Sequence, residues 1–126
     1  MVLNVIVVDD SAMMRLVIGR ALRILGLPIG RVDEAGDGVA ALAVLRARPF
    51  DLAIIDINMP IMNGFELIDA IAADPLLAHV PIVVVSTEAS RVQLATMRDG
   101  GIRFVRKPFD PERLLEAIVG ALGGSP

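Results

Sequence analysis

The residues of this sequence that could do chemistry lie directly after short apolar runs. Asp9 and Asp10 follow the run Leu3–Val8, and Asp56 ends the run Asp51–Asp56. Carboxylate oxygens are hard ligands that suit Mg²⁺ or Mn²⁺ better than zinc or copper. Like charges held close together also need a cation or a shared proton to relieve their repulsion. The three acids therefore predict a Mg²⁺ site, with Mn²⁺ as the alternative ion, if the fold brings them together.

Two further pairs of residues occupy the same kind of position. Ser86 and Thr87 end a third apolar run, and Lys107 and Pro108 follow a fourth. Lys107 is the only lysine of the chain, whereas the other eleven basic residues are arginines. A lone lysine in this composition indicates a position that favours a compact point charge over a planar guanidinium. Each pair alone fits an ordinary helix cap or loop, so it is their combination that indicates a functional site.

Apolar runs and helical patterns alternate along the chain. The apolar runs predict β-strands at Leu3–Val8, Arg31–Ala35, Asp51–Asp56, Pro81–Ser86 and Ile102–Arg106. Capping residues and apolar side chains at helical spacing predict helices between Ser11 and Gly26, between Asp37 and Arg48, over Gly64–Ala72 and Glu88–Arg98, and from Asp110 to Leu122. The buried stripe of the last helix is expected to be Leu114, Leu115, Ile118, Val119 and Leu122. The solvated face of the first helix is expected to carry Arg15, Arg20 and Arg23.

This alternation predicts both the fold and the place of the site. Strands that are apolar on both faces, each followed by a helix, indicate a parallel sheet covered by helices on both sides. We predict the α/β class, as a flavodoxin-like, doubly wound (βα)5 fold with a five-stranded parallel sheet in the order 2-1-3-4-5. Such sheets bind ligands at the carboxyl ends of their strands. Strands 1 and 3 are neighbours in this order, so the three acids are expected to converge.

Length and composition limit the class of protein. A chain of 126 residues with 55% hydrophobic residues and a mean hydropathy of +0.67 predicts one folded domain spanning residues 1–126. The net charge of −3 argues against nucleic-acid binding, and the absence of cysteine excludes disulfides and zinc–thiolate sites. No apolar run is long enough for a membrane span, and the apolar start lacks the basic residues of a secretory signal. We therefore expect a soluble, cytoplasmic monomer.

Four motifs together resemble the receiver domain of two-component response regulators, and within that family the stand-alone CheY-like proteins of chemotaxis. They are VVDDSAMMR, DINMPIMNG, VVVSTE and FVRKPF, and the resemblance extends over nearly the whole chain. It implies a phosphoprotein of signal transduction, to which a histidine kinase donates a phosphoryl group in a Mg²⁺-dependent reaction. Such a protein is not an enzyme, since it assists only its own phosphorylation and dephosphorylation.

The resemblance also implies a role for each residue of the predicted site. Asp56 would be the phospho-acceptor. The Mg²⁺ ligands would be Asp9, Asp10, Asp56 and the backbone carbonyl of Asn58. Ser86 and Lys107 would each contact a phosphoryl oxygen. The residues expected to flank the site are Asn58, Met59, Thr87, Glu88 and Pro108.

A conformational switch is implied as well. The ring of Phe104 would follow the state of Ser86, and a downstream protein would bind the face made by the fourth helix, the fifth strand and the fifth helix. Three positions depart from the family pattern: Ser86 replaces the commoner threonine, Thr87 replaces alanine or glycine, and Phe104 replaces tyrosine. We expect serine to preserve function, because it keeps the hydroxyl, and Thr87 to narrow access to Asp56.

Three alternative interpretations remain open. The chain could be a receiver cut from a longer regulator with an output domain, because the tail Gly-Gly-Ser-Pro fits a linker as well as a natural end. It could be a Mg²⁺-dependent phosphatase that forms an aspartyl phosphate. That chemistry typically needs a second acid two residues after the nucleophile, where this chain has Asn58. The third is a degenerate receiver that binds partners without phosphorylation, which the complete set of site residues disfavours.

Overall fold

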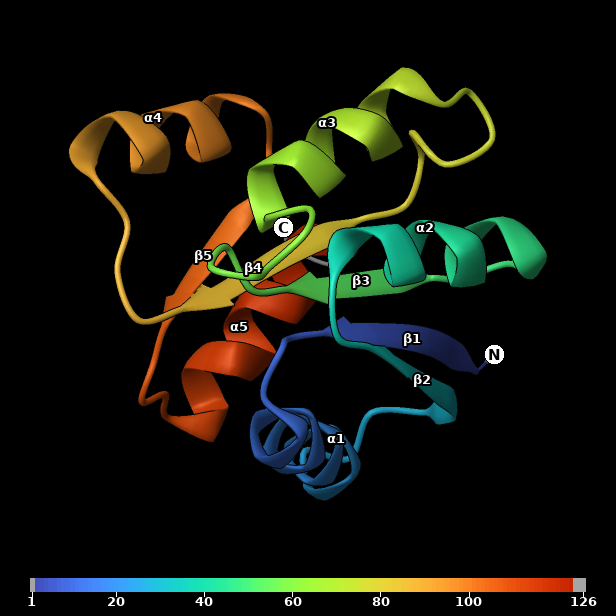
Figure 1. Cartoon of the computed structure of the whole chain (residues 1–126). Coiled ribbons are helices and arrows are strands. Elements are labelled where there is room, and N and C mark those ends of the chain that lie inside the picture. The colour runs from blue at the N-terminus through green and yellow to red at the C-terminus, as the bar shows by residue number, and fades with distance from the viewer. Residues whose placement is uncertain (1, 124–126) are drawn as a thin grey trace.

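Five strands alternate with five helices over residues 2–123, the part of the chain that the computed structural model describes (Figure 1). The strands are β1 (Leu3–Val8), β2 (Ile29–Ala35), β3 (Leu52–Ile55), β4 (Ile82–Ser86) and β5 (Arg103–Arg106). The helices are α1 (Ala12–Ile24), α2 (Gly38–Ala47), α3 (Gly64–Ala73), α4 (Arg91–Asp99) and α5 (Pro111–Ala121). The tail Gly-Gly-Ser-Pro, which is expected to be either a linker or a natural end, comprises residues 123–126. Its last three residues, 124–126, lie outside the described residues.

The strands form one parallel sheet in the order β2-β1-β3-β4-β5. β1 lies between β2 and β3, and its last residue, Val8, pairs with Ala35 on one side and with Ile55 on the other. This order confirms the predicted flavodoxin-like α/β fold. It also brings the carboxyl ends of β1 and β3 next to each other, as the candidate site requires.

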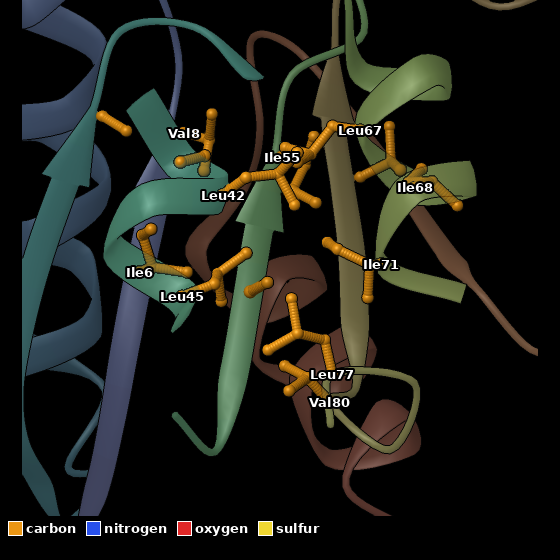
Figure 2. Close-up of a cluster of buried hydrophobic side chains, with 14 of the residues drawn as sticks. Ile6, Val8, Leu42, Leu45, Ile55, Leu67, Ile68, Ile71, Leu77 and Val80 are labelled. Atoms are coloured by element: carbon orange, nitrogen blue, oxygen red, sulfur yellow. The ribbon is translucent and has the colours of Figure 1, made fainter. Parts of the chain in front are cut away.

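Helices cover both faces of the sheet, with α2, α3 and α4 on one side and α1 and α5 on the other (Figure 1). Alternate residues of a strand point to opposite faces, so Ile6 of β1 belongs to the core beneath α2–α4 and Val7 to the core beneath α1 and α5. Figure 2 shows the first core, in which Leu45 of α2 and Ile71 of α3 pack over the strands. Each fully buried aliphatic side chain contributes roughly 1.5–3 kcal/mol, so both cores hold the strand ends firmly in place.

The edge strand β2 is longer than predicted. It begins at Ile29 instead of Arg31, and Ile29 pairs with Leu3 of β1. The Leu3 amide also donates a hydrogen bond to the carbonyl of Pro28 at 2.7 Å. Pairing with a buried central strand therefore extends β2 through Gly30, a residue type that favours a strand only weakly, to Ile29.

The fourth helix begins three residues later than predicted, at Arg91 instead of Glu88. Ser90 caps it: the Ser90 Oγ accepts a hydrogen bond from the Gln93 amide at 3.1 Å, and the Gln93 Oε1 accepts one from the Ser90 amide at 2.8 Å. This reciprocal cap satisfies two backbone donors at the helix start. Glu88 is therefore left in the loop that follows β4.

The last helix buries a narrower stripe than predicted. Leu114 and Ile118 are fully buried as expected, and Ala117 is buried beside them. The other three residues of the predicted stripe are only half-buried: Leu115, Val119 and Leu122. α5 packs against β4 and β5 at the edge of the sheet, so only a narrow face of the helix is covered. None of the helices within residues 2–123 is long and apolar enough to cross a membrane.

Candidate functional site

Three acids meet where β1 and β3 end, as predicted. One carboxylate oxygen from each of Asp9, Asp10 and Asp56 lies within 4.8 Å of the other two. Asp9 and Asp56 are buried, with 1% and 6% of their surfaces exposed, whereas Asp10 is exposed. Three oxygen donors at this separation, with one of them facing solvent, fit the hard cations Mg²⁺ and Mn²⁺.

Backbone pairing continues past both strand ends and holds the two buried acids. The Asp9 amide donates to the carbonyl of Ala35 in β2 at 3.1 Å. The Asp56 amide donates to the carbonyl of Val8 in β1 at 2.9 Å. Because each acid directly follows a paired residue, its side chain leaves the sheet from a fixed position.

Lys107 forms ion pairs with the same two buried acids, Asp9 and Asp56. Its Nζ is 2.7 Å from Asp9 Oδ2 and 3.6 Å from Asp56 Oδ2, and its side chain is only 11% exposed. The Lys107 amide donates to the carbonyl of Ser86 at 2.8 Å, which attaches the end of β5 to the end of β4. The peptide bond between Lys107 and Pro108 is cis. The predicted lysine therefore reaches the acids from the end of β5, the last of the four contributing strands.

The electrostatic state of Asp56 reflects a balance of opposing effects. Burial raises the pKa of Asp56 above its ordinary value, and the nearby charge of Asp9 raises it further. Ser86, the Lys107 ammonium and the Asn58 amide at 3.4 Å each oppose that rise. Burial is the largest of these causes, so the net effect is a raised pKa.

The Ser86 hydroxyl is buried at the end of β4 and lacks a satisfied hydrogen bond. Ser86 is 0% exposed, and its Oγ has no partner at hydrogen-bonding geometry among residues 2–123. The hydroxyl is nevertheless close enough to Asp56 to lower the pKa of that carboxyl, so it lies beside the acid without a well-formed bond to it. An unsatisfied buried hydroxyl costs about 1–3 kcal/mol. A group that brought an acceptor oxygen to this position would recover that energy.

The predicted flanking residues lie around the rim of the site. Asn58, Thr87, Glu88 and Pro108 are exposed, whereas Met59 is buried in the core beneath α2–α4. Asn58 and Glu88 line an open cavity of about 430 Å³. The polar rim is therefore accessible to solvent, while Met59 has a packing role.

Phe104 is connected to the end of β4 through Arg106. The Phe104 ring is half-buried, and the Arg106 guanidinium lies over it, 5.6 Å from the ring centre. Arg106 Nη1 also donates to the carbonyl of Thr87 at 3.1 Å. One side chain thus contacts both the residue after Ser86 and the ring predicted to move.

Arg15 lies at the acidic cluster and not on the solvated face where the helical pattern predicts it. Arg15 Nη1 donates to the backbone carbonyl of Asp9 at 2.6 Å, and Arg15 Nε donates to Glu34 Oε1 at 2.8 Å. Its side chain is only 20% exposed. Its position in the first turns of the helix after the two acids is the only signal in the sequence that could have indicated this contact.

Gly64 has a steric role that the motif alone did not explain. A Cβ at this position would lie 2.3 Å from the Asp56 carbonyl oxygen and 2.8 Å from the Ile57 Cα. The Gly64 amide donates to the Ile57 carbonyl at 2.8 Å. The start of α3 therefore packs directly on the backbone that carries Asp56.

Comparison with known proteins agrees with the resemblance noted from the motifs. Residues 5–119 match the family model described as the response regulator receiver domain. The chemotaxis protein CheY of Pseudomonas aeruginosa is 38% identical over 117 residues, which cover 92% of this chain and 93% of that protein. CheY-3 of Vibrio cholerae is 35% identical over 117 residues, which cover 92% of this chain and 88% of that protein.

The solved structures show the same likeness in three dimensions. The chemotaxis response regulator CheY4 of Vibrio cholerae matches with a TM-score of 0.83 and 33% identity, covering 97% of this chain and 100% of that one. The acidic cluster of Asp9, Asp10 and Asp56 is typical of the Mg²⁺ site of receivers. The chain therefore belongs to the response regulator receiver domain family, as a CheY-like signalling protein and not an enzyme.

Proposed function

We propose that this protein accepts a phosphoryl group on Asp56 and then changes its binding to a partner protein. The placement of Asp56 carries the proposal: its buried carboxylate lies 3.6 Å from the Lys107 ammonium and within 4.8 Å of two other acids. The receiver family implies a histidine kinase as the phosphodonor. The names of its relatives support a place in chemotaxis-type signalling. We further propose that residues 1–126 form one receiver domain, which acts in the cytoplasm as a monomer.

Asp56 is the nucleophile in the proposed reaction. One of its carboxylate oxygens attacks the phosphorus atom of the donor, and a new O–P bond forms while the bond between phosphorus and the donor breaks. The donor leaves with the electron pair, as imidazole from a phosphohistidine or as a carboxylate from an acyl phosphate. During transfer the phosphoryl group carries negative charge on three oxygens. The Lys107 ammonium and the Ser86 hydroxyl each offer a donor to one of them.

The residues that would hold Mg²⁺ are Asp9, Asp10, Asp56 and the backbone carbonyl of Asn58. Bound Mg²⁺ supplies a Lewis acid that stabilises negative charge on phosphoryl oxygens. The chain orients Asp9 for this purpose, because Asp9 Oδ1 accepts a hydrogen bond from the Ser11 amide at 2.9 Å. The same bond restrains rotation of the carboxylate about its own side-chain torsion.

The switch is proposed to begin at Ser86 and to end at Phe104. A phosphoryl oxygen on Asp56 supplies an acceptor to the buried Ser86 hydroxyl, which has no hydrogen-bond partner within the described part of the chain. Movement of Ser86 toward it shifts Thr87, whose carbonyl is bonded to Arg106. Arg106 lies over the Phe104 ring, so the cover on that ring changes with the position of Thr87. This is a two-state equilibrium in which the phosphoryl group favours one state.

The proposed partner surface is the face of α4, β5 and α5. An open cavity of about 640 Å³ lies on the part formed by β5 and α5. Its lining includes Arg103, Phe104, Arg106, Phe109 and Arg113. A change at Phe104 therefore alters a surface that a partner can reach.

Phosphorylation by a small donor tests the proposal directly. The protein is incubated with Mg²⁺ and acetyl phosphate, and intact mass is measured; one added phosphoryl group is expected. Asp56→Asn removes the nucleophile and should abolish the addition. Asp69→Asn, at an exposed position of α3, is the matched control and should leave the yield unchanged. Equal phosphorylation of Asp56→Asn and wild type would overturn the assignment.

A further inference from the structure

Arg15 makes two contacts in different directions. From α1, its Nη1 donates to the Asp9 carbonyl at 2.6 Å, and its Nε donates to Glu34 Oε1 near the end of β2 at 2.8 Å. With 20% of its side chain exposed, Arg15 is more enclosed than Glu34, at 52%. The guanidinium therefore ties the loop after β1 to the neighbouring edge strand.

The carbonyl that Arg15 holds belongs to the peptide group that joins Asp9 to Asp10. A peptide group is planar, so holding its oxygen sets the direction in which the backbone continues to Asp10. Asp10 is exposed, and the direction of its carboxylate depends on the backbone that carries it. Asp9, by contrast, has its carboxylate oxygens bonded to the Ser11 amide and to Lys107.

Both contacts require the shape of arginine. A guanidinium presents several N–H donors in a rigid fork, so Nε and Nη1 can bond two acceptors at once. A lysine has one flexible ammonium on a plain carbon chain and cannot reproduce this pair of directions. The positive charge of Arg15 by itself would weaken the binding of a cation to the cluster, because a nearby cation repels a second cation from the acids.

We propose that Arg15 is a positioning residue for the acidic cluster, which orients the Asp9–Asp10 peptide so that the Asp10 carboxylate points to the same cation as the Asp9 carboxylate. It acts through the Asp9 carbonyl and does not touch the cation. The inference rests on the proposed Mg²⁺ site. Residues that orient metal ligands in this way typically change metal affinity by roughly 10–100-fold when they are replaced.

Titration with MgCl₂ alone, followed by amide NMR shifts or calorimetry, measures this effect without any phosphorylation. Arg15→Lys keeps the charge and loses the fork, and Arg15→Gln loses both. If Arg15 positions the acids, both variants bind Mg²⁺ roughly tenfold more weakly than wild type. If Arg15 acts only by charge, Arg15→Lys matches wild type and Arg15→Gln binds more tightly; that result overturns the proposal. Arg20→Gln, at an exposed position of the same helix, is the control and should resemble wild type within the effect of one surface charge.

A second variant tests the anchor of Arg15, and a measurement at saturating Mg²⁺ separates positioning from a folding defect. Glu34→Gln weakens the ion pair that anchors Arg15, and the Glu34 side chain is half-exposed. This variant should bind Mg²⁺ more weakly than wild type, but less weakly than Arg15→Lys does. At saturating Mg²⁺, phosphorylation of Arg15→Lys by acetyl phosphate should recover, since only the apparent affinity for the ion has changed.

The outcomes distinguish this inference from the proposed function. Equal Mg²⁺ affinities in wild type and Arg15→Lys overturn the positioning role of Arg15 and leave the proposed function unaffected. Wild-type protein that binds no Mg²⁺ overturns it as well. Wild-type protein that binds Mg²⁺ but accepts no phosphoryl group overturns the proposed function, and a weaker Arg15→Lys would then still support the positioning role.

Discussion

The Lys107 ammonium is bonded to Asp9 more closely than to Asp56, at 2.7 Å compared with 3.6 Å. The lysine therefore lies against a proposed metal ligand, with the proposed phospho-acceptor as its second neighbour. One ammonium partly offsets the repulsion between two buried carboxylates that lie within 4.8 Å of each other. A compact charge at this point serves both acids, which agrees with the presence of a single lysine in the chain.

Replacing Lys107 should slow phosphorylation. We expect Lys107→Ala to reduce the rate with acetyl phosphate by roughly 100-fold, the loss typical of removing one well-placed donor. Lys107→Arg should also be impaired, because a planar guanidinium does not fit a buried position that suits a point charge. Intact mass against time measures both rates. Arg91→Lys, at an exposed position of α4, should match wild type, and a wild-type rate in Lys107→Arg would contradict the role given to the lysine.

Asp56→Asn should make the folded protein more stable at neutral pH when Mg²⁺ is absent. The pKa of Asp56 is raised by burial, so between its unfolded and folded pKa values the folded protein binds more protons than the unfolded one. Stability contributed by Asp56 is then lost as the pH rises through this window, by about 1.4 kcal/mol for each unit of pKa elevation. The neutral amide of asparagine avoids that loss.

Urea unfolding followed by circular dichroism in chelator, over a series of pH values, measures this difference. Circular dichroism is needed because the chain has no tryptophan or tyrosine. The advantage of Asp56→Asn over wild type should shrink as the pH falls and become constant below about 3, where the carboxyl is protonated in both states. An advantage that stays the same at every pH would show that ionisation of Asp56 is not its source.

Gly64→Ala should destabilise the fold and disturb Asp56. The added Cβ would lie 2.3 Å from the Asp56 carbonyl oxygen, which is a backbone atom that cannot rotate away. We expect a loss of about 1–3 kcal/mol, the usual cost of forcing extra volume into a packed site, together with slower phosphorylation. Gly19→Ala in α1 is the matched control, because nothing lies within 4 Å of its added Cβ. That variant should gain about 0.5–1 kcal/mol from helix propensity.

Mg²⁺ should stabilise the wild-type protein through the acidic cluster. At a concentration ten times its Kd, the ion should add about 1.4 kcal/mol to the free energy of unfolding, which raises Tm by a few degrees. Asp10→Asn removes one proposed ligand and should lose most of this gain, whereas Asp69→Asn should keep it. Thermal melts with and without MgCl₂ measure the shift, and an equal shift in Asp10→Asn and wild type would exclude Asp10 as a ligand.

Most of the fold could be predicted because buried parallel strands are continuous apolar runs, and those are visible without any partner. β1 has the bounds predicted for it, and β4 ends at Ser86 as expected. The predicted bounds were less accurate where contact with another segment or a capping residue determines where an element begins. β2 is extended by its pairing with β1, and α4 begins at Arg91 because Ser90 and Gln93 cap each other.

The members of the candidate site could be predicted from the sequence, but the hydrogen bonds and ion pairs between its side chains and their neighbours could not. The three acids, Ser86 and Lys107 could be chosen because each directly follows or ends a predicted strand. Arg15 could not be recognised, since an arginine on an amphipathic helix has the same sequence pattern whether its guanidinium is in water or bonded to a carbonyl. Its acceptors come from Asp9 and Glu34, and the second of these lies 19 residues away.

The amino-acid sequence by itself determined the order of strands and helices, the hard-oxygen character of the site, and the absence of any thiol chemistry. Only the tertiary structure decided that Lys107 bonds to Asp9, 98 residues away, that the Ser86 hydroxyl has no hydrogen-bond partner among residues 2–123, and that Arg15 holds the backbone between two acids. The physical reason is that local patterns reflect which face of an element is buried. Distances between side chains from different strands depend on how the sheet pairs and how both layers of helices pack against it.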